Sequence, residues 1–462
     1  MKTFTRLAVA GVIAIAALQL VRPSIPSKPA TAQIQAPPEV KRILEKDCYS
    51  CHSDQLRLAW FDQIVPGYWL VRHDILNARA HLDFSTLGSK PAPAQKATLY
   101  EAVNMIQLGA MPLPSFRQLH PEANVTPDEL ATLKSYLAPW SSALIQPGAA
   151  TGTTTASPGP KTAENLGNAS GPLKLETVQP ELNEFPFDPD FENWKPIAIT
   201  DRGDNNTLRF ILGNDIAFRA AQSGDISPWP NGAQFAKIAW QQERGADGLV
   251  HPGKFIQVEL MLKQADRYRN TEGWGWGRWR RLDLKPYGKD SQFVTECTSC
   301  HLPVRGDDYV YTLPITPAKV SRDEVVNHRA ASLPTGLPYQ PLAWRAITLY
   351  VDPQNHTMAT LFGNDVAMRS VQARGESDAR GPAYSSGAVL ALITWAQRDD
   401  PHWFGARIPD MPRSVEFVQV AGDGQTNSYR RFAGSGFAED HSSSVTAQRI
   451  SFILSLPPAQ LP

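Results

Sequence analysis

The chain has 462 residues, of which 42% are hydrophobic and 19% charged, and its 45 basic residues balance its 45 acidic residues. This composition is typical of a globular protein rather than a disordered one, and the length is sufficient for about three domains. The balanced charge gives no reason to expect nucleic acid or an anionic membrane surface as a partner.

The N-terminus has the features of a secretory signal peptide over residues 1–32. Lys2 and Arg6 precede a mostly apolar run from Leu7 to Val21, and Ala30-Thr31-Ala32 forms a small-x-small cleavage pattern. We therefore expect cleavage after Ala32 and export of the folded part to the periplasm or beyond, with no membrane contact after cleavage. The apolar run is short compared with the roughly 20 residues of a spanning helix, and an uncleaved membrane anchor is the alternative.

Two pentapeptides use all four cysteines, Cys48-Tyr49-Ser50-Cys51-His52 and Cys297-Thr298-Ser299-Cys300-His301. C-x-x-C-H is the attachment signature of c-type haem, in which the two thiols form thioethers with the haem vinyl groups. The histidine that follows is then the proximal ligand of the iron. We therefore expect two covalently attached haems, with His52 and His301 as iron ligands, and no disulfide.

A redox dithiol and a zinc site are the alternative interpretations of these motifs. A zinc site made from two C-x-x-C units usually has about 15–20 residues between them, whereas a far longer segment separates these two. A dithiol does not explain why a histidine directly follows both second cysteines. Covalent haem is therefore the favoured interpretation of both motifs.

Residues 36–140 are predicted to form an all-α, cytochrome c-like haem domain. Thr126-Pro127-Asp128-Glu129 combines an N-cap residue, proline at the first helical position and glutamate at the capping-box position. These features predict a helix that begins at Pro127. A further helix is expected over Ala94–Leu108.

The loop after the expected helix Ala94–Leu108 carries a candidate sixth ligand for the first haem. Met111 lies in Gly109-Ala110-Met111-Pro112, and a thioether sulfur is a good sixth ligand for a low-spin haem. The prolines that follow Met111 would hold its sulfur in place. The alternative is a buried methionine that only fills a gap, and Met105 is the competing ligand.

The rest of the chain contains a repeat, because Trp194–Gly224 aligns without a gap with Trp344–Arg374. Each copy is predicted to be an α+β domain with an antiparallel sheet. The second copy has no cysteine, and Leu392 stands in place of Lys237, so we expect a haem-less packing or docking module. In the first copy, the predicted strands are Thr207–Leu212, Phe235–Trp240 and Phe255–Leu262, and the predicted helix is Asp215–Gln222.

The chain is therefore predicted to be a multidomain protein. Its all-α haem domain would be followed by two α+β antiparallel-sheet domains. The expected boundaries are 36–140 for the first haem domain, 183–315 for the second and 341–456 for the haem-less copy, with linkers at 141–182 and 316–340.

Two stretches of the chain resemble known families. Cys48 to Trp140 is similar to small haem-binding domains in its Cys-Tyr-x-Cys-His-Ser start, its Trp69-Leu70-Val71 segment and its Met111-Pro112-Leu113-Pro114 loop. Phe187 to Pro314 resembles the cytochrome P-460 family and its relative, the cytochrome c-prime-beta group. The segments that carry this second resemblance are Leu208–Asp215, Trp229–Lys237 and the C-x-x-C-H motif that follows them.

The cytochrome P-460 resemblance implies a five-coordinate haem with one open face. In catalytic members of the family a lysine is bonded to a haem meso carbon, and Lys237 stands where that lysine belongs. These members oxidise hydroxylamine, and nitric oxide chemistry leads to nitrous oxide. The residues alone leave the role of Lys237 open: strand alternation places it on one face with Phe235 and Ala239, and a solvent-reaching or edge-strand lysine is the alternative.

The resemblance also implies a carboxylate that accepts protons a few residues before the C-x-x-C-H motif. Gln292 occupies that place, and glutamine cannot act as a general base. Glu296 and Asp290 are the nearby alternatives. The glycine-separated tryptophans of this region are expected either to line the haem or to fill a core; they are Trp274, Trp276 and Trp279.

The sequence therefore predicts an exported diheme c-type cytochrome with two covalently attached haem c groups, one of them joined to Lys237. The favoured function is a redox enzyme that oxidises hydroxylamine or handles nitric oxide at the second haem. Electrons would leave through the His/Met haem to a redox partner protein. The alternatives are a non-catalytic nitric oxide-binding cytochrome and a plain electron-transfer cytochrome.

Overall fold

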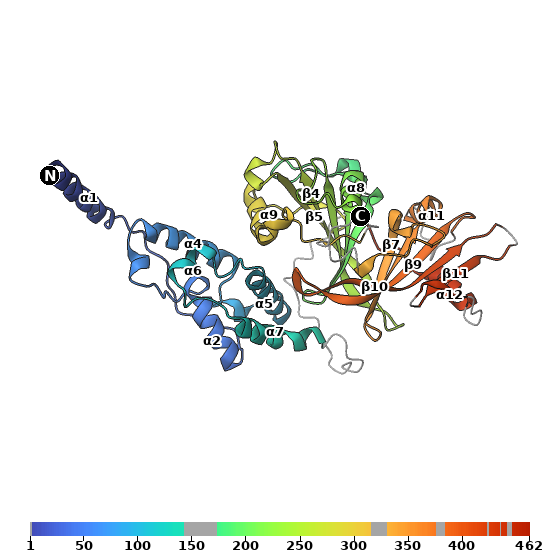
Figure 1. Ribbon diagram of the computed structural model, residues 1–462, viewed down its shortest axis with the longest axis horizontal. Helices are drawn as coiled ribbons and strands as arrows, with labels where there is room; N and C mark the ends of the chain where they lie inside the picture. Colours follow the sequence, from blue (N-terminus) through green and yellow to red (C-terminus); the bar gives the residue numbers. More distant parts are fainter. Residues whose placement is uncertain are drawn as a thin grey trace, which may run out of the picture. The chain divides into compact units, whose positions relative to one another are not determined.

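The computed structural model describes residues 2–142, 173–315, 330–375, 384–422, 425–434, 436–440 and 446–462 (Figure 1). The chain divides into two compact units, Met1–Ser141 and Ser142–Pro462. Most of the first predicted linker, 141–182, and part of the second, 316–340, lie outside the described residues.

The first unit is helical (Figure 1). Its α-helices are α1 Lys2–Leu18, α2 Pro38–Asp47, α3 Tyr49–His52, α4 Gly67–His81, α5 Ala92–Gln107, α6 Pro114–Leu119 and α7 Pro127–Ser142. The predicted capping box of α7 is confirmed: the Thr126 hydroxyl accepts from the N–H of Glu129 at 3.2 Å, and the Glu129 carboxylate accepts from the N–H of Thr126 at 2.9 Å. Within the described part of the chain, no helix has the length and apolar character needed to cross a membrane.

The segment between α1 and α2 packs against the rest of this unit. Ile25 is buried in an apolar cluster with side chains of α4. The Tyr68 hydroxyl donates to the carbonyl of Pro23 at 2.6 Å, and the N–H of Gly88 donates to the carbonyl of Ala32 at 2.9 Å. This segment is therefore part of the folded unit.

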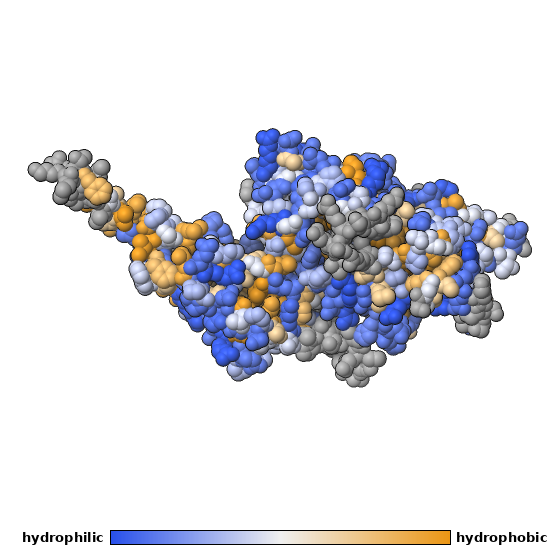
Figure 2. Space-filling model, viewed as in Figure 1, coloured by the Kyte–Doolittle hydropathy of each residue, from blue (hydrophilic) through white to orange (hydrophobic). Residues whose placement is uncertain are grey.

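Hydrophobic surface is prominent on the first unit in the view of Figure 2, and its exposed apolar residues include Leu20, Trp60, Leu70 and Leu119.

In the described residues of the second unit, 12 strands form one antiparallel sheet. The strands are β1 Lys195–Arg202, β2 Thr207–Gly213, β3 Gln234–Arg244, β4 Val250–Lys263, β5 Trp274–Arg280, β6 Lys285–Pro286, β7 Arg345–Asp352, β8 Thr357–Gly363, β9 Val389–Asp400, β10 Trp403–Gln419, β11 Ser428–Ala433 and β12 Ala438–Asp440. They pair in the order β1-β2-β3-β4-β7-β8-β9-β10-β11-β12, while β5 pairs with β4 and β6 with β5. β1 also pairs with β10, so the strand order forms a closed ring that includes strands of both copies.

The two copies of the repeat have the same order of elements. β1, β2, helix α8 (Asp215–Ser223), β3 and β4 recur as β7, β8, helix α11 (Asp365–Gly375), β9 and β10. Asn214 caps α8, since its side-chain oxygen accepts from the N–H of Ala217 at 2.9 Å. Its side-chain amide donates to a backbone carbonyl in the turn that precedes β3. Asn364 makes the same two kinds of bond at α11. The Gly-Asn-Asp sequence shared by the copies therefore starts a helix and ties it to the sheet.

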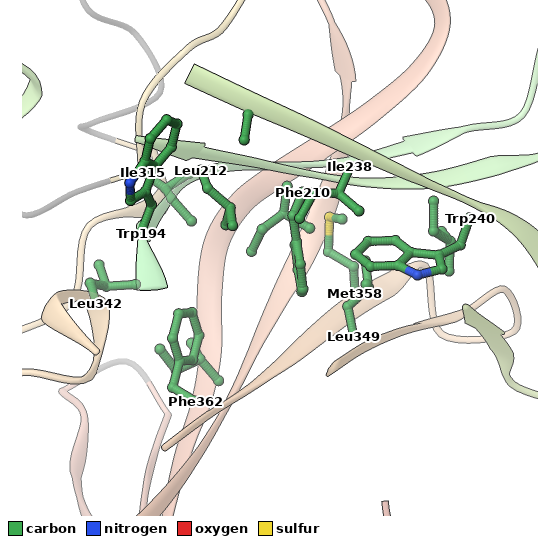
Figure 3. Packing of buried hydrophobic residues seen from close by; sticks show 14 of the residues in the cluster. Trp194, Phe210, Leu212, Ile238, Trp240, Ile315, Leu342, Leu349, Met358 and Phe362 are labelled. Atoms are coloured by element: carbon green, nitrogen blue, oxygen red, sulfur yellow. The ribbon is translucent and has the colours of Figure 1, made fainter. Parts of the chain in front are cut away.

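One apolar core joins the two copies (Figure 3). Trp240 of β3 lies in the same buried cluster as Met358 and Phe362 of β8. The indole N–H of Trp240 also donates to the carbonyl of Gln460 at 2.6 Å. The sequence predicts two α+β sheet domains, whereas the structure joins both copies in one unit, because each copy buries one apolar face of its strands against the other.

Candidate haem-binding sites

The first C-x-x-C-H motif lies at the junction of α2 and α3. The N–H of Cys48 donates to the carbonyl of Leu44 at 2.9 Å and closes α2. His52 Nδ1 lies 3.0 Å from the carbonyl oxygen of Leu82. Because a carbonyl oxygen can only accept, Nδ1 carries the proton of this hydrogen bond. Burial lowers the pKa of His52, so the ring is neutral near pH 7 and its unprotonated Nε2 can bind a metal.

The second motif lies at the C-terminal end of helix α9, Val294–His301. His301 Nδ1 is 2.6 Å from the carbonyl oxygen of Tyr309, so Nδ1 again carries the proton. Burial lowers the pKa of His301 to about 4, and this ring too is neutral with an unprotonated Nε2. The rings of Trp276 and Tyr311 flank the imidazole at centroid distances of 4.6 and 5.2 Å. The hydrogen bond and the two flanking rings therefore hold the His301 imidazole in one orientation.

The cysteines of the motifs are partly buried thiols. Burial raises the pKa of Cys48 and Cys297 to about 12 and that of Cys51 to about 11, so these thiols are protonated near pH 7. A redox dithiol needs a reactive thiolate, which these surroundings disfavour. A neutral imidazole with a free Nε2 beside two buried thiols is the donor set that haem c requires. The residues of both motifs therefore fit a covalently attached haem.

Three strands place a row of charged side chains beside the second motif. Lys237 of β3, Glu259 of β4 and Arg278 of β5 lie directly opposite one another in the sheet register. Because side chains alternate along a strand, Trp276 lies on the same face as Arg278, and its ring packs against His301. The charged row therefore lies on the face of the sheet that carries the second motif.

The Glu259 carboxylate is bound by two cations. Lys237 Nζ forms an ion pair with Glu259 Oε2, and Arg278 Nε lies 3.2 Å from Glu259 Oε1. Burial lowers the pKa of Lys237 to about 8, although Glu259 opposes this effect. Burial also acts to raise the pKa of Glu259, but the two cations outweigh it and lower this pKa to about 2. Glu259 therefore stays ionised, while Lys237 becomes neutral under mildly alkaline conditions.

The acid–base residues expected from the sequence lie in different surroundings. Glu296 is exposed and accepts a hydrogen bond from the Tyr287 hydroxyl at 3.0 Å. Asp290 is also exposed, and Gln292 lies in the short 3-10 turn Ser291–Phe293 that precedes α9. The structure therefore places Lys237 in the charged row with Glu259, and Glu296 and Asp290 at the surface.

Glu259 is a functional candidate that motif spacing does not reveal. It lies on β4, where polar Gln257 and Glu259 alternate with apolar Val258 and Leu260. This alternation indicates that one strand face carries polar groups, which is the available signal in the sequence. Only the strand register shows that Glu259 meets Lys237.

The three tryptophans before the second motif divide between two cores. Trp274 and Trp276 belong to the apolar cluster that also contacts the motif, whereas Trp279 is buried in the core shared by the two copies. The glycines between them allow close packing: a Cβ at Gly277 would lie 2.7 Å from the ring of Phe185. The indole nitrogen of Trp276 is buried without a hydrogen-bond partner, next to His301.

Met111 lies in the loop between α5 and α6 of the first unit. Its N–H donates to the carbonyl of Met105 at 3.1 Å, and both side chains are partly buried. The loop that carries Met111 is therefore tied to the end of the helix that carries Met105.

The second copy uses the corresponding sheet position differently. Glu416 of β10 is paired with Leu392 of β9, so it occupies the place that Glu259 has opposite Lys237. Arg449, from helix α12 (Thr446–Ser455), binds the Glu416 carboxylate through bonds of 2.8 and 2.7 Å. Other side chains of α12 are buried against the same face. The helix α12 therefore covers the face that corresponds to the one contacted by α9 in the first copy.

Glu259 should stabilise the fold only where its carboxylate is ionised. The fold lowers its pKa from the ordinary 4.5 to about 2, so the unfolded chain takes up the proton first as the pH falls. The free energy of unfolding should therefore decline as the pH falls from 4.5 towards 2, by roughly 3 kcal/mol from this residue at about 1.4 kcal/mol per pKa unit. In urea unfolding of the chain before haem attachment, between pH 7 and 3, Glu259→Gln should be less stable at pH 7, because Lys237 loses its partner, and should decline less steeply.

Glu176→Gln is the matched control, because Glu176 is exposed and lies outside the sheet, in the short 3-10 turn Leu175–Thr177. Its stability should follow that of the parent protein at every pH. A Glu259→Gln variant that declined as steeply as the parent would show that another group causes the loss.

Comparisons with known protein families agree with the positions of the two motifs. Residues 8–139 match the family model of the Haem-binding domain, and residues 188–312 match that of Cytochrome P460. The second match includes Lys237, Glu259 and the second C-x-x-C-H motif. No match was found among curated proteins. The chain thus carries a match to a Haem-binding domain followed by a match to a Cytochrome P460 domain.

Proposed function

We propose that the protein is a diheme c-type cytochrome in which each C-x-x-C-H motif holds one haem covalently. The observation that supports this is the same in both domains. His52 and His301 each donate the Nδ1 proton to a backbone carbonyl, at 3.0 and 2.6 Å, and keep Nε2 for a metal. Such a bond fixes the tautomer of a metal-binding histidine and raises its basicity.

The first haem would serve electron transfer. His52 and Met111 would hold it from its two faces, and a His/Met pair gives a low-spin haem of high potential. The position of Met111 in the loop after α5 supports this role, because the loop is tied to the helix through the carbonyl of Met105.

The second haem would be the reactive one, held by His301 with its other face open to a small nitrogenous substrate. When bound, this haem supplies an iron that can take electrons from hydroxylamine or bind nitric oxide. The match of this domain to Cytochrome P460 and the position of Lys237 beside the motif support the proposal. Lys237 would be joined covalently to the haem: one Nζ–C bond would replace an N–H bond of the lysine and a C–H bond of the haem, and a two-electron oxidant of the peroxide class would take up the two electrons and the two protons.

Lys237 and Glu259 would then depend on each other. As an ion-pair partner Glu259 is a weak base, because its pKa is about 2. Once bonded to a haem carbon, the Lys237 amine would no longer carry the charge that lowers this pKa. The pKa of Glu259 would then rise from its ion-paired value, with Arg278 still opposing the rise, and Glu259 could accept a proton from substrate. The cross-link would therefore prepare the base.

A non-catalytic nitric oxide-binding cytochrome is the second candidate. Gln292 occupies the place where a base is expected, and Lys237 has an ionic partner in Glu259 without any cross-link. Glu296 and Asp290, the other candidate bases, are exposed. These observations favour binding without turnover.

We also propose that the protein is exported and keeps its N-terminal helix. The sequence predicts export, with cleavage after Ala32 or an uncleaved anchor as alternatives. The burial of Ile25 and the hydrogen bonds to the carbonyls of Pro23 and Ala32 favour retention of this segment over cleavage after Ala32. Cleavage after Ala32 would remove all of these interactions from the first unit.

The mass of the denatured protein tests haem number and processing together. Thioether bonds survive denaturation, so fully matured protein should have the mass of a chain that includes α1 and two haems. Fewer than two haems would contradict the diheme proposal, and a chain that starts after Ala32 would contradict retention of the helix. The matched variants are the double Cys→Ser changes at Cys48 and Cys51 and at Cys297 and Cys300, each of which should remove one haem.

Met111→Ala should remove the low-spin His/Met signal of the first haem and lower its potential, since the thioether favours reduced iron. Near-infrared magnetic circular dichroism should report this loss while the signals of the second haem stay unchanged. Met105→Ala is the matched control, because it removes a sulfur from the adjoining helix, and it should leave the ligation intact. Methionine ligation that persists in Met111→Ala would assign the ligand to another residue.

Peptide mapping should find Lys237 joined to haem, and Lys237→Ala should give an ordinary c-type spectrum. Glu259→Gln should keep the cross-link but slow hydroxylamine oxidation by about 10²–10⁴-fold, the usual contribution of a general base. Stopped-flow reduction of the haem by hydroxylamine measures this rate.

Glu296→Gln is the control for this experiment and should retain the parent rate. A parent protein with unmodified Lys237 would overturn the cross-link and favour the nitric oxide-binding candidate. If the cross-link forms without turnover, the glutamine at position 292 is the cause we expect, and Gln292→Glu should then raise the rate.

A further inference from the structure

The second copy of the repeat contacts the segment that follows the second haem motif, through the turn between β9 and β10 and the first residue of β10. His402 Nδ1 lies 2.9 Å from the carbonyl oxygen of Tyr311. The ring of Trp403 meets the ring of Tyr311 edge to face at a centroid distance of 5.4 Å. Two neighbouring residues of the haem-less copy therefore hold one residue of the haem-carrying copy.

Tyr311 in turn contacts the motif in two ways. Its hydroxyl donates to the carbonyl of Cys300 at 2.7 Å, and its ring stands edge to face against His301 at 5.2 Å. Tyr309, two residues earlier on the same segment, supplies the carbonyl that accepts the proton of His301 Nδ1. The segment from Tyr309 to Tyr311 thus sets both the ring plane of His301 and its hydrogen bond.

The β9–β10 turn is itself held firmly by the first copy. The indole N–H of Trp403 donates to Asp204 at 3.3 Å, and the guanidinium of Arg202 lies 4.2 Å from the centre of the Trp403 ring. Arg202 and Asp204 form a buried ion pair, with Arg202 Nε 2.6 Å from the Asp204 carboxylate. Arg202 is also paired with Ala406 where β1 meets β10. The turn can therefore act as a fixed support for the segment that it contacts.

We propose that His402 and Trp403 are positioning residues for the second haem site, so that the haem-less copy tunes the iron ligand of the first copy. Through Tyr311 they hold the Tyr309 carbonyl in place to accept from His301 Nδ1. A hydrogen bond to the outer nitrogen of a ligating histidine makes the ring a stronger donor to the metal. This inference rests on the proposed haem at Cys297 and Cys300.

The test is His402→Ala in the full-length, haem-loaded protein. The ferrous iron–histidine stretching band of the second haem should move to lower frequency in resonance Raman spectra, and the midpoint potential of that haem should rise. Both shifts follow from a weakened hydrogen bond on His301. His402→Asn should restore part of each, because its amide can still donate to the carbonyl of Tyr311.

His356→Asn, which changes an exposed histidine of the same copy, is the control and should leave both signals unchanged. The first haem is the internal reference in every sample. If His402→Ala folds poorly, Tyr311→Phe provides the second variant, since it removes only the hydroxyl that binds Cys300 and should shift the same band.

Two results would contradict the inference, and they can be told apart. Variants that lose thermal stability but keep the parent stretching band and potential would overturn the inference, because His402 would then be structural only. A mass that shows no haem at the second motif would instead remove the proposed function and, with it, this role for His402 and Trp403.

Discussion

A hydrogen bond from a histidine ring nitrogen to a backbone carbonyl controls what each motif can bind. It places the proton of His52 and His301 on Nδ1, while burial keeps both rings neutral. Without the carbonyls of Leu82 and Tyr309, a buried imidazole would have no preference for the tautomer that leaves Nε2 free. At the second motif, aromatic rings, partly buried thiols and the charged row surround His301, whose Nε2 is left free for a metal.

The two copies neutralise a carboxylate at corresponding positions of the sheet in different ways. A buried carboxylate needs a cation close by, since an unpaired buried charge is strongly destabilising. In the first copy the cations that bind Glu259 come from strands, Lys237 and Arg278, and α9 remains able to carry the motif. In the second copy the cation is Arg449 from the covering helix α12, which binds Glu416. The element that supplies the cation therefore distinguishes the two faces.

Much of the local structure follows from short-range signals. Thr126 and Glu129 form the expected capping box, and the strands expected around Thr207–Leu212 and Phe235–Trp240 are β2 and β3. The C-x-x-C-H motifs indicate haem because the chemistry needs only residues that are close in the chain. These features depend on neighbours within a few positions, so spacing alone predicts them. The joining of the copies is different, because the core around Trp240 combines apolar faces from distant parts of the sequence.

The amino-acid sequence by itself determined the two motifs, the helical start of the chain and the repeat of its sheet elements. Only the tertiary structure decided that Glu259 faces Lys237, because that contact depends on the register between two strands. The same is true of the contact between His402 and Tyr311, which are 91 residues apart. Contacts of this kind are set by which faces of the sheet are buried together, and no local spacing in the sequence records that choice.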